Sequence, residues 1–323
     1  MNLTPEDVVS AYKLFLDRAP ESEEAVMYWA RHTSEELRNG FLASEEYCRK
    51  TGSRTIVPSL SGYEAPVHAQ VDELTPDESR ALFGEIKTQW TKLGEVDPLW
   101  AVLSTDEFRA RDDPEKIIEF YAGGKSDLEL IDKTLSRNGI ALPENATVVE
   151  YGCGLGRVTW HLAGRFSHVV GIDISGSMIA AADAYMRQHR IGNVSFQLLR
   201  EIEDIDELPS CDLFFSLLVL QHNPPPLIGR IIRSAVRSLR PGGVALFQVP
   251  TYCEDYRFTV DEYLSGKRTR GASEAAFEMH IIPQRDLFRI IHDAGGLLVE
   301  IYENTKAGDS GGWMSNTLLI RRL

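Results

Sequence analysis

The chain has 323 residues, of which 43% are apolar and 25% are charged, and this length predicts about two domains on the usual scale of ~150 residues per domain. Its 48 acidic residues outnumber its 34 lysines and arginines, which leaves a net charge of −14. This composition excludes collagen-like and disordered chains, and the acidic charge argues against nucleic acid and anionic membranes as main partners, because both are bound through basic surfaces.

Residues 1–52 are predicted to form a small helical module. Thr4 is suited to cap a first helix, because Pro5 occupies its first position and Asp7 stands three residues after the cap. Ser22, Ser34 and Ser44 each precede a glutamate and are predicted to cap further helices. Residues 53–70 are poor in periodicity and rich in serine, glycine and proline, so they are predicted to be a linker.

Residues 71–143 are predicted to be a mostly helical lead-in that serves as a lid over a cofactor. One helix is expected to begin at Ser126, because Ser126 and Glu129 form a capping-box pattern, and to end at Asn138-Gly139. Tyr121, just upstream of this helix, is the candidate lid residue, with plain packing as an equal alternative.

From residue 144 onward, short apolar runs alternate with amphipathic helices. The predicted strands are Thr147–Tyr151, His168–Ile174, Val194–Leu199, Asp212–Leu218, Gly243–Val249, Leu297–Glu303 and Trp313–Arg321. This alternation predicts an α/β fold, with a Rossmann-like doubly wound and mostly parallel seven-stranded sheet, preceded by an all-helical N-terminal region. The last strand is predicted to be antiparallel, because the loop before it is too short for a crossover helix.

Two general features bear on the compartment. No run of about 18 uncharged apolar residues is present, and the acidic N-terminal residues do not resemble a signal peptide, so no membrane span is expected. The cysteines are Cys48, Cys153, Cys211 and Cys253. Their scatter, without a Cys-x-x-Cys pair, favours reduced thiols in a cytoplasmic protein and predicts no metal site.

The most informative segment is VVEYGCGLGR, residues 148–157, in which a buried strand runs into a glycine-rich turn and a helix begins. Glycines let the backbone approach a ligand closely, and a helix N-terminus offers unpaired N–H groups. The next strand ends at Asp173, about 20 residues further on, where a carboxylate would bind the ribose of an adenosine cofactor. A dinucleotide fingerprint needs a third glycine where Arg157 or Thr159 stands, so the spacing disfavours NAD.

Glu150-x-Gly-x-Gly-x-Gly resembles the first motif of class I S-adenosylmethionine-dependent methyltransferases of the small-molecule branch. Asp173 resembles their ribose-binding acid, residues 212–222 resemble their fourth-strand motif, and residues 239–243 resemble the turn before their fifth strand. The resemblance covers about residues 144–323 and implies S-adenosyl-L-methionine as cofactor. The residues expected to bind it are Tyr121, Glu150, Gly152, Cys153, Gly154, Gly156, Arg157, Asp173, Ile174, Ser175, Met178, Glu201, Leu217 and Leu218. For the adenine contact, Glu201, Glu203 and the backbone near Arg200 stay open.

His222 and His280 are the predicted catalytic residues. An oxygen acceptor needs a base, whereas an amine needs only to arrive deprotonated, and His222 follows the fourth strand at the edge of the sheet where ligands bind. The resemblance places His280 and Trp313 at the border of the active site. Residues 251–282 are predicted to be an acceptor lid, in which Lys267, Arg268 and Arg270 are candidates for holding an anion, with a solvated loop as the alternative.

The hypothesis is therefore a methyltransferase acting on a small or carbohydrate-like acceptor, by O-methylation in glycan or secondary metabolite biosynthesis. Residues 1–52 resemble a helical module that recurs in bacterial surface-glycan proteins, which favours a glycan acceptor and suggests a protein partner for this module. Two alternatives stay open: a non-catalytic scaffold that binds S-adenosylmethionine, and an NAD-dependent oxidoreductase.

Overall fold

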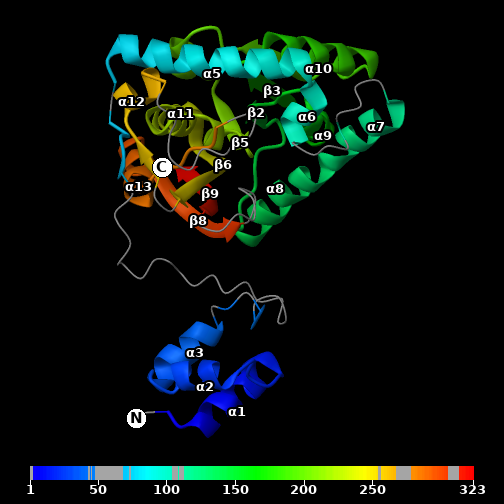
Figure 1. Cartoon of the computed structure of the whole chain (residues 1–323). Helices are drawn as coiled ribbons and strands as arrows, with labels where there is room; N and C mark the ends of the chain where they lie inside the picture. Colours follow the sequence, from blue (N-terminus) through cyan, green and yellow to red (C-terminus); the bar gives the residue numbers. More distant parts are fainter. Residues whose placement is uncertain are drawn as a thin grey trace. The chain divides into compact units, whose positions relative to one another are not determined.

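The computed structural model describes residues 3–42, 44, 46–47, 68–72, 74–103, 108, 113–253, 256–266, 278–304 and 313–323. The chain divides into two compact units, Met1–Pro66 and Val67–Leu323 (Figure 1). The predicted basic residues of the acceptor lid, Lys267, Arg268 and Arg270, lie outside the described residues.

The described part of the N-terminal unit contains the helices α1 (Pro5–Leu16), α2 (Glu23–Trp29) and α3 (Ser34–Leu42). Their apolar faces bury a small core of Val8, Ala11, Tyr12, Leu16, Leu37 and Phe41. The predicted helix cap at Thr4 is confirmed and is a reciprocal capping box, since Thr4 Oγ1 accepts from Asp7 N and the Asp7 carboxylate accepts from Thr4 N. The cap of α3 is Thr33 and not the predicted Ser34, because Thr33 forms the reciprocal pair with Glu36.

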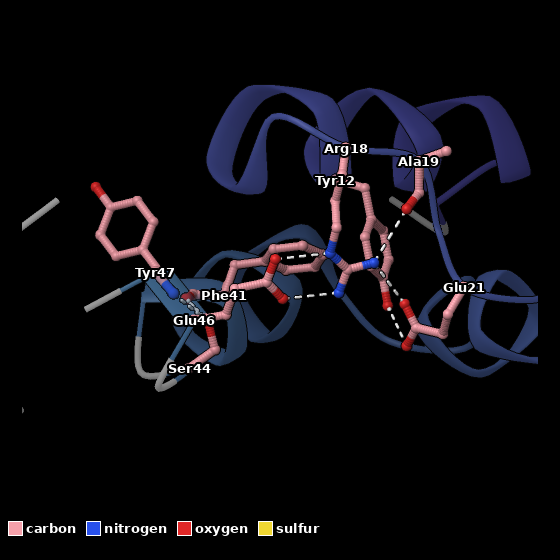
Figure 2. Close-up of polar contacts among 8 residues, drawn as sticks. All are labelled: Tyr12, Arg18, Ala19, Glu21, Phe41, Ser44, Glu46 and Tyr47. Carbon is pink, nitrogen blue, oxygen red and sulfur yellow. Dashed lines mark hydrogen bonds and ion pairs between the residues drawn. The ribbon is translucent and has the colours of Figure 1, made fainter. Parts of the chain in front are cut away.

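Arg18 joins separate segments of this unit (Figure 2). Its Nε and Nη2 donate to the two carboxylate oxygens of Glu46 at 2.7 and 2.8 Å, and its Nη1 donates to Glu21 Oε2 at 2.8 Å. The same guanidinium lies 5.1 Å from the centre of the Tyr12 ring. A bidentate arginine is suited to this bridging, because its planar fork fits a carboxylate.

The second unit contains a seven-stranded sheet in the order β4-β3-β2-β5-β6-β9-β8. Its strands are β2 (Thr147–Tyr151), β3 (His168–Asp173), β4 (Val194–Leu198), β5 (Cys211–Ser216), β6 (Leu239–Cys253), β8 (Gly296–Asn304) and β9 (Trp313–Arg322). β9 runs antiparallel to both of its neighbours, β6 and β8, whereas β2 to β6 pair with one another in parallel. The predicted α/β fold with an antiparallel last strand is therefore confirmed.

Helices cover both faces of this sheet (Figure 1). They are α5 (Pro76–Val96), α6 (Pro98–Leu103), α7 (Pro114–Gly123), α8 (Lys125–Arg137), α9 (Arg157–Arg165), α10 (Gly176–Gln188), α11 (Pro225–Ser238), α12 (Val260–Leu264) and α13 (Gln284–Asp293), with 3₁₀ turns η2 (Ile202–Ile205) and η3 (Leu220–His222). Successive residues of β5 point to opposite faces. Phe214 packs in the core with α5, α11 and α13, whereas Phe215 packs in the core with α8 and α9.

The predicted range of the linker, residues 53–70, includes residues at its C-terminal end that belong to the second unit. His68–Ala69 form strand β1, which pairs in parallel with β7 (Arg257–Phe258) in a separate two-stranded sheet. Gln70 continues this attachment, because its N donates to Phe258 O and its Oε1 accepts from Val260 N, both at 3.0 Å. A two-residue strand carries no periodicity, so the pattern of residues did not predict it.

The predicted capping role of Ser126 is wrong. Helix α8 begins at Lys125, its N-cap is Gly124, and Ser126 Oγ instead donates to Gly123 O at 2.9 Å. Tertiary packing sets this boundary, because a Cβ at Gly124 would lie 2.3 Å from Arg157 O. The junction of α7 and α8 can therefore rest on the start of α9 only if this residue is glycine.

Two of the general expectations can be compared with the described residues. Cys153, Cys211 and Cys253 are buried free thiols, and Cys48 lies outside the described ranges. Within those ranges, no helix is both long enough and apolar enough to cross a bilayer.

Candidate active site

A cavity of about 550 Å³ opens at the carboxyl ends of β2, β3 and β5, where ligands bind in open α/β sheets. Its walls come from the glycine loop after β2, the end of β3, the segment after β5, and helices α5, α6 and α8. The residues predicted to bind the cofactor that line it are Glu150, Gly152, Cys153, Gly154, Arg157, Asp173, Ile174, Met178, Leu217 and Leu218, and the predicted base His222 lines it too.

The loop after β2 needs its glycines for conformation and for space. Gly152, Gly154 and Gly156 have φ values of 77°, 51° and 79°, which residues with a side chain rarely adopt. A Cβ at Gly152 would also lie 2.4 Å from Val219 Cγ2, so the loop rests directly against the segment after β5. Gly156 was predicted to bind the cofactor, but it does not line the cavity. A Cβ at this position would lie 3.0 Å from Met186 Cε, so the glycine permits close packing of the loop on α10.

The Asp173 carboxylate organises the loop while it faces the cavity. Its Oδ2 accepts from Gly154 N and its Oδ1 accepts from Ser175 N, both at 2.8 Å. Burial raises the pKa of Asp173, and these backbone N–H groups act against the rise. Each carboxylate oxygen can still accept a further hydrogen bond, as a ribose hydroxyl would require. Ser175 itself is fully buried and does not line the cavity, so its contact with the cofactor stays a prediction.

Four polar side chains lie together beside the glycine loop. Glu150 is 5% exposed and accepts from the Thr159 hydroxyl, and burial raises its pKa to about 8, so we expect the carboxyl to keep its proton at neutral pH. Arg157 Nη2 donates to Asp127 Oδ2 at 2.6 Å. Arg157 Nε is buried with no hydrogen-bond partner among the described residues. Arg157 itself lines the cavity, and a guanidinium with an unsatisfied donor suits a carboxylate ligand, such as that of the methionine moiety of S-adenosylmethionine.

His222 faces the cavity as a neutral imidazole. It is 8% exposed, and burial lowers its pKa to about 4. Its Nδ1 lies 3.1 Å from Glu278 O, and because a carbonyl only accepts hydrogen bonds, Nδ1 carries the hydrogen. Nε2 therefore holds the lone pair, 3.4 Å from Gln221 Nε2. This arrangement can take a proton from a bound hydroxyl group.

Residues 148–243, which contain the glycine loop, Asp173 and His222, match the family model described as "Methyltransferase domain". This match makes this part of the chain similar to a class I methyltransferase domain. The matched range contains the buried strand, the glycine loop and the acid that would contact ribose. S-adenosyl-L-methionine is the cofactor of this class.

The chain is similar to several curated methyltransferases. It is 41% identical over 116 residues to trans-aconitate 2-methyltransferase of Deinococcus radiodurans, a match that covers 34% of this chain and 40% of the relative. It is 31% identical over 144 residues to the protein of that name from Methylobacterium nodulans, covering 44% and 52%. Ubiquinone biosynthesis O-methyltransferase of Paraburkholderia phytofirmans is 26% identical over 133 residues, covering 40% and 56%. The chain spans about half the length of the curated relatives it matches.

Two further residues expected at the cofactor site of the methyltransferase domain lie elsewhere. Tyr121 does not line the cavity. Its hydroxyl donates to Leu155 O at 2.8 Å and its ring stacks on Tyr185 with centroids 3.6 Å apart, so it packs α7 against the glycine loop and α10. Glu201 is exposed outside the cavity, in a turn where its N donates to Asp204 Oδ2 at 3.0 Å. Leu199 lines this part of the wall instead.

His280 was predicted to be catalytic, but it lies outside the cavity. It is fully buried and does not line the cavity, because Tyr256, Phe258 and Tyr263 pack around its ring. Its Nδ1 lies 2.8 Å from the Tyr256 hydroxyl, and its backbone N donates to Gln221 O at 2.6 Å. Burial lowers its pKa to about 3. His280 thus supports the cavity wall from behind.

Sequence reasoning missed much of the wall opposite the glycine loop. These residues are Phe83, Ile86 and Trp90 on α5, Ala101, Val102 and Leu103 around α6, and Gln221, Asn223 and Met279. Their helical spacing is the same for a face that packs in a core and for a face that lines a cavity. The one available signal was the number of large aromatics in the predicted lead-in.

Proposed function

We propose that the chain is an S-adenosylmethionine-dependent methyltransferase that transfers a methyl group to an oxygen of a small or carbohydrate-like acceptor, in glycan or secondary metabolite biosynthesis. One observation carries the proposal. A glycine loop, an acid suited to ribose and a neutral histidine line a single cavity, so an adenosine cofactor and a hydroxyl acceptor can lie side by side. Proximity of this kind supplies much of the acceleration of a displacement reaction.

The cofactor side of the cavity matches the charge pattern of S-adenosylmethionine, which supplies an electrophilic methyl group on sulfur when bound. Asp173 would accept hydrogen bonds from the ribose hydroxyls. Arg157 Nε, which has no partner among the described residues, would donate to the carboxylate. Glu150 and Asp127 would face the ammonium group, and the Glu150 carboxyl would give up its proton when that positive charge arrives.

The acceptor side combines aromatic and amide groups. Phe83 and Trp90 offer apolar faces to a ring, and the Trp90 ring lies 5.0 Å from the His222 ring. Gln221 and Asn223 bring amide groups that can bond hydroxyls. His222 Nε2 would take the proton of the attacking hydroxyl, which raises the nucleophilicity of its oxygen. Such a wall favours a hydroxylated ring, and the resemblance of residues 1–52 to a surface-glycan module favours a sugar.

Binding measurements separate this proposal from an NAD-dependent oxidoreductase. We expect calorimetry of the full chain to detect micromolar S-adenosylhomocysteine binding and no NAD binding. Asp173→Ala should abolish the binding of S-adenosylhomocysteine. Asp173→Asn should weaken this binding ~10–100-fold, because a charge-assisted hydrogen bond contributes about 1.5–3 kcal/mol. Asp183→Ala is the matched control, since Asp183 pairs with Arg187 outside the cavity. Unchanged affinity in Asp173→Ala would refute the cofactor site.

Transfer itself needs a separate assay. The chain is incubated with methyl-labelled S-adenosylmethionine and a pool of bacterial glycans and metabolites, and mass spectrometry identifies a labelled product. We expect a labelled ether, whose formation His222→Ala suppresses while S-adenosylhomocysteine still binds. Binding without any labelled product would favour the non-catalytic scaffold.

The N-terminal unit is proposed to bind a protein partner. Leu14, Met27 and Tyr28 are 79%, 51% and 58% exposed, so α1 and α2 both present large apolar side chains to solvent. Cross-linking of the full chain in its source cell should capture one partner, and Leu14→Asp with Tyr28→Asp should abolish that capture without altering S-adenosylhomocysteine affinity. Equal capture by the doubly substituted chain would contradict this role.

A further inference from the structure

Gln248 is a fully buried glutamine in the middle of the sheet. It lies on β6 between Phe247 and Val249 and pairs with Thr317 of β9. An amide in such a position is costly unless its hydrogen bonds are made. Gln248 makes three of them, and each reaches a different residue outside β6.

The first bond holds the turn that faces the cofactor. Gln248 Oε1 accepts from Leu218 N at 3.0 Å. Leu218 lines the cavity and has a φ of 61°, a left-handed conformation that is strained for a residue with a side chain. The next residue, Val219, rests against Gly152. The bond from Gln248 thus stabilises a strained residue directly beside the glycine loop.

The second bond orients a neighbour of the predicted base. Gln248 Nε2 donates to Gln221 Oε1 at 3.1 Å and to Ser315 Oγ at 2.7 Å. Because the oxygen of Gln221 is turned toward Gln248, its amide nitrogen is turned toward His222 Nε2, at 3.4 Å. Glu278 O acts on the other side of the ring and keeps the hydrogen on Nδ1.

We propose that Gln248 is a positioning residue that joins the cofactor-binding turn at Leu218 to the base His222 through Gln221. This inference rests on the proposed function, in which His222 Nε2 receives the acceptor proton. The acceptor hydroxyl replaces the long contact from the Gln221 amide and finds the lone pair already aimed at it. The side chain of Gln248 therefore positions both the turn at Leu218 on the cofactor side and, through Gln221, the His222 ring on the acceptor side.

The test uses the full chain with three single substitutions. Gln248→Met removes all the side-chain hydrogen bonds of Gln248 and keeps its approximate volume. Gln221→Met removes the contacts of the Gln221 amide with Gln248 and His222, but leaves the bond from Leu218 N to Gln248 Oε1 in place. Thr251→Val is the matched control, because it removes another buried bond between β6 and β9, in which Asn316 Nδ2 donates to Thr251 Oγ1 at 2.6 Å. Calorimetry gives the S-adenosylhomocysteine affinity, and ¹⁵N NMR of labelled histidines gives the state of each His222 ring nitrogen.

In the unsubstituted chain we expect His222 to show a protonated Nδ1 and an unprotonated Nε2. Gln248→Met should weaken S-adenosylhomocysteine binding about tenfold, equivalent to the loss of one hydrogen bond, and should shift the Nε2 resonance. Gln221→Met should shift the same resonance while the affinity stays within about twofold. Thr251→Val should change neither quantity.

A rescue experiment separates positioning from general destabilisation. Leu218→Gly in the Gln248→Met background should recover the affinity, because glycine adopts a positive φ without strain. Gln248→Met with an unchanged Nε2 resonance would overturn the link to His222, and unchanged affinity would overturn the link to Leu218. If Gln248→Met fails to fold, an unshifted Nε2 resonance in Gln221→Met overturns the proposal. If the unsubstituted chain binds no S-adenosylhomocysteine, the proposed function fails, and the NMR comparison still tests the link to His222.

Discussion

Glu150→Gln is expected to stabilise the cofactor-free methyltransferase domain at neutral pH. The Glu150 carboxyl is 5% exposed, and its pKa is raised from 4.5 to about 8. A raised pKa means that the native state holds a proton that the unfolded chain releases, so this group destabilises the fold as pH rises from about 4.5 to about 8. Glutamine removes the titration and can still accept from the Thr159 hydroxyl.

The size of the effect follows from the difference between the two pKa values. At pH 7 the unfolded carboxyl is ionised and the native one is mostly protonated, so the native state loses about 1.4 kcal/mol for each pH unit above the ordinary value, or roughly 3 kcal/mol in total. The gain from Glu150→Gln should thus vanish near pH 4.5 and reach its maximum above pH 8. Affinity for S-adenosylhomocysteine should fall, because the variant cannot ionise beside the ammonium group.

Thermal unfolding at pH 5 and pH 8 without cofactor is the assay. The relevant transition is the one that S-adenosylhomocysteine raises, since a ligand stabilises the unit that binds it. Glu144→Gln is the control, because it makes the same chemical change at a glutamate that is exposed to solvent in the native state. A change in Tm for Glu150→Gln that is equal at pH 5 and pH 8 would refute the argument from burial.

Two other predictions concern the packing of residues around the cavity. The pKa values of His222 and His280 are lowered to about 4 and about 3, so the stability that these neutral rings support is present above pH 6.5 and is lost as pH falls toward 4. His280→Gln should therefore flatten the dependence of urea unfolding on pH between 6.5 and 4, and an unaltered dependence would contradict the burial of a neutral ring. Gly152→Ala should destabilise the domain by ~1–3 kcal/mol and abolish S-adenosylhomocysteine binding, because its Cβ would lie 2.4 Å from Val219 Cγ2 at a φ of 77°. Val219→Ala in the Gly152→Ala background should restore part of the stability, because it provides space for the new Cβ. Urea unfolding measures the stability, and calorimetry measures the binding of S-adenosylhomocysteine.

The sheet was predictable because its strands are short apolar runs separated by amphipathic helices. Strands that helices cover on both faces must be apolar throughout, so this pattern survives in the amino-acid order alone. The boundaries were less predictable, since Gly124 replaces Ser126 as the cap of α8 for a reason that lies in α9. The strand β1 depends in the same way on β7, which lies far along the chain.

Sequence alone also predicted most of the residues that line the proposed cofactor half of the cavity. The glycine loop and Asp173 act through backbone conformation and one carboxylate at the ends of adjacent strands, and both requirements are local to β2 and β3. Glu201 and Tyr121 were misplaced because a turn and a stacked ring direct them away from the cavity.

The acceptor half was decided by tertiary structure. His222 and His280 carry the same chemistry in the sequence, yet one lines the cavity and the other lies behind its wall. The orientation of His222 depends on Trp90, Glu278 and, through Gln221, Gln248. These residues come from separate segments of the chain that only the folded structure brings together. The order of residues thus specifies the groups available, and burial by distant segments selects the one that can accept a proton.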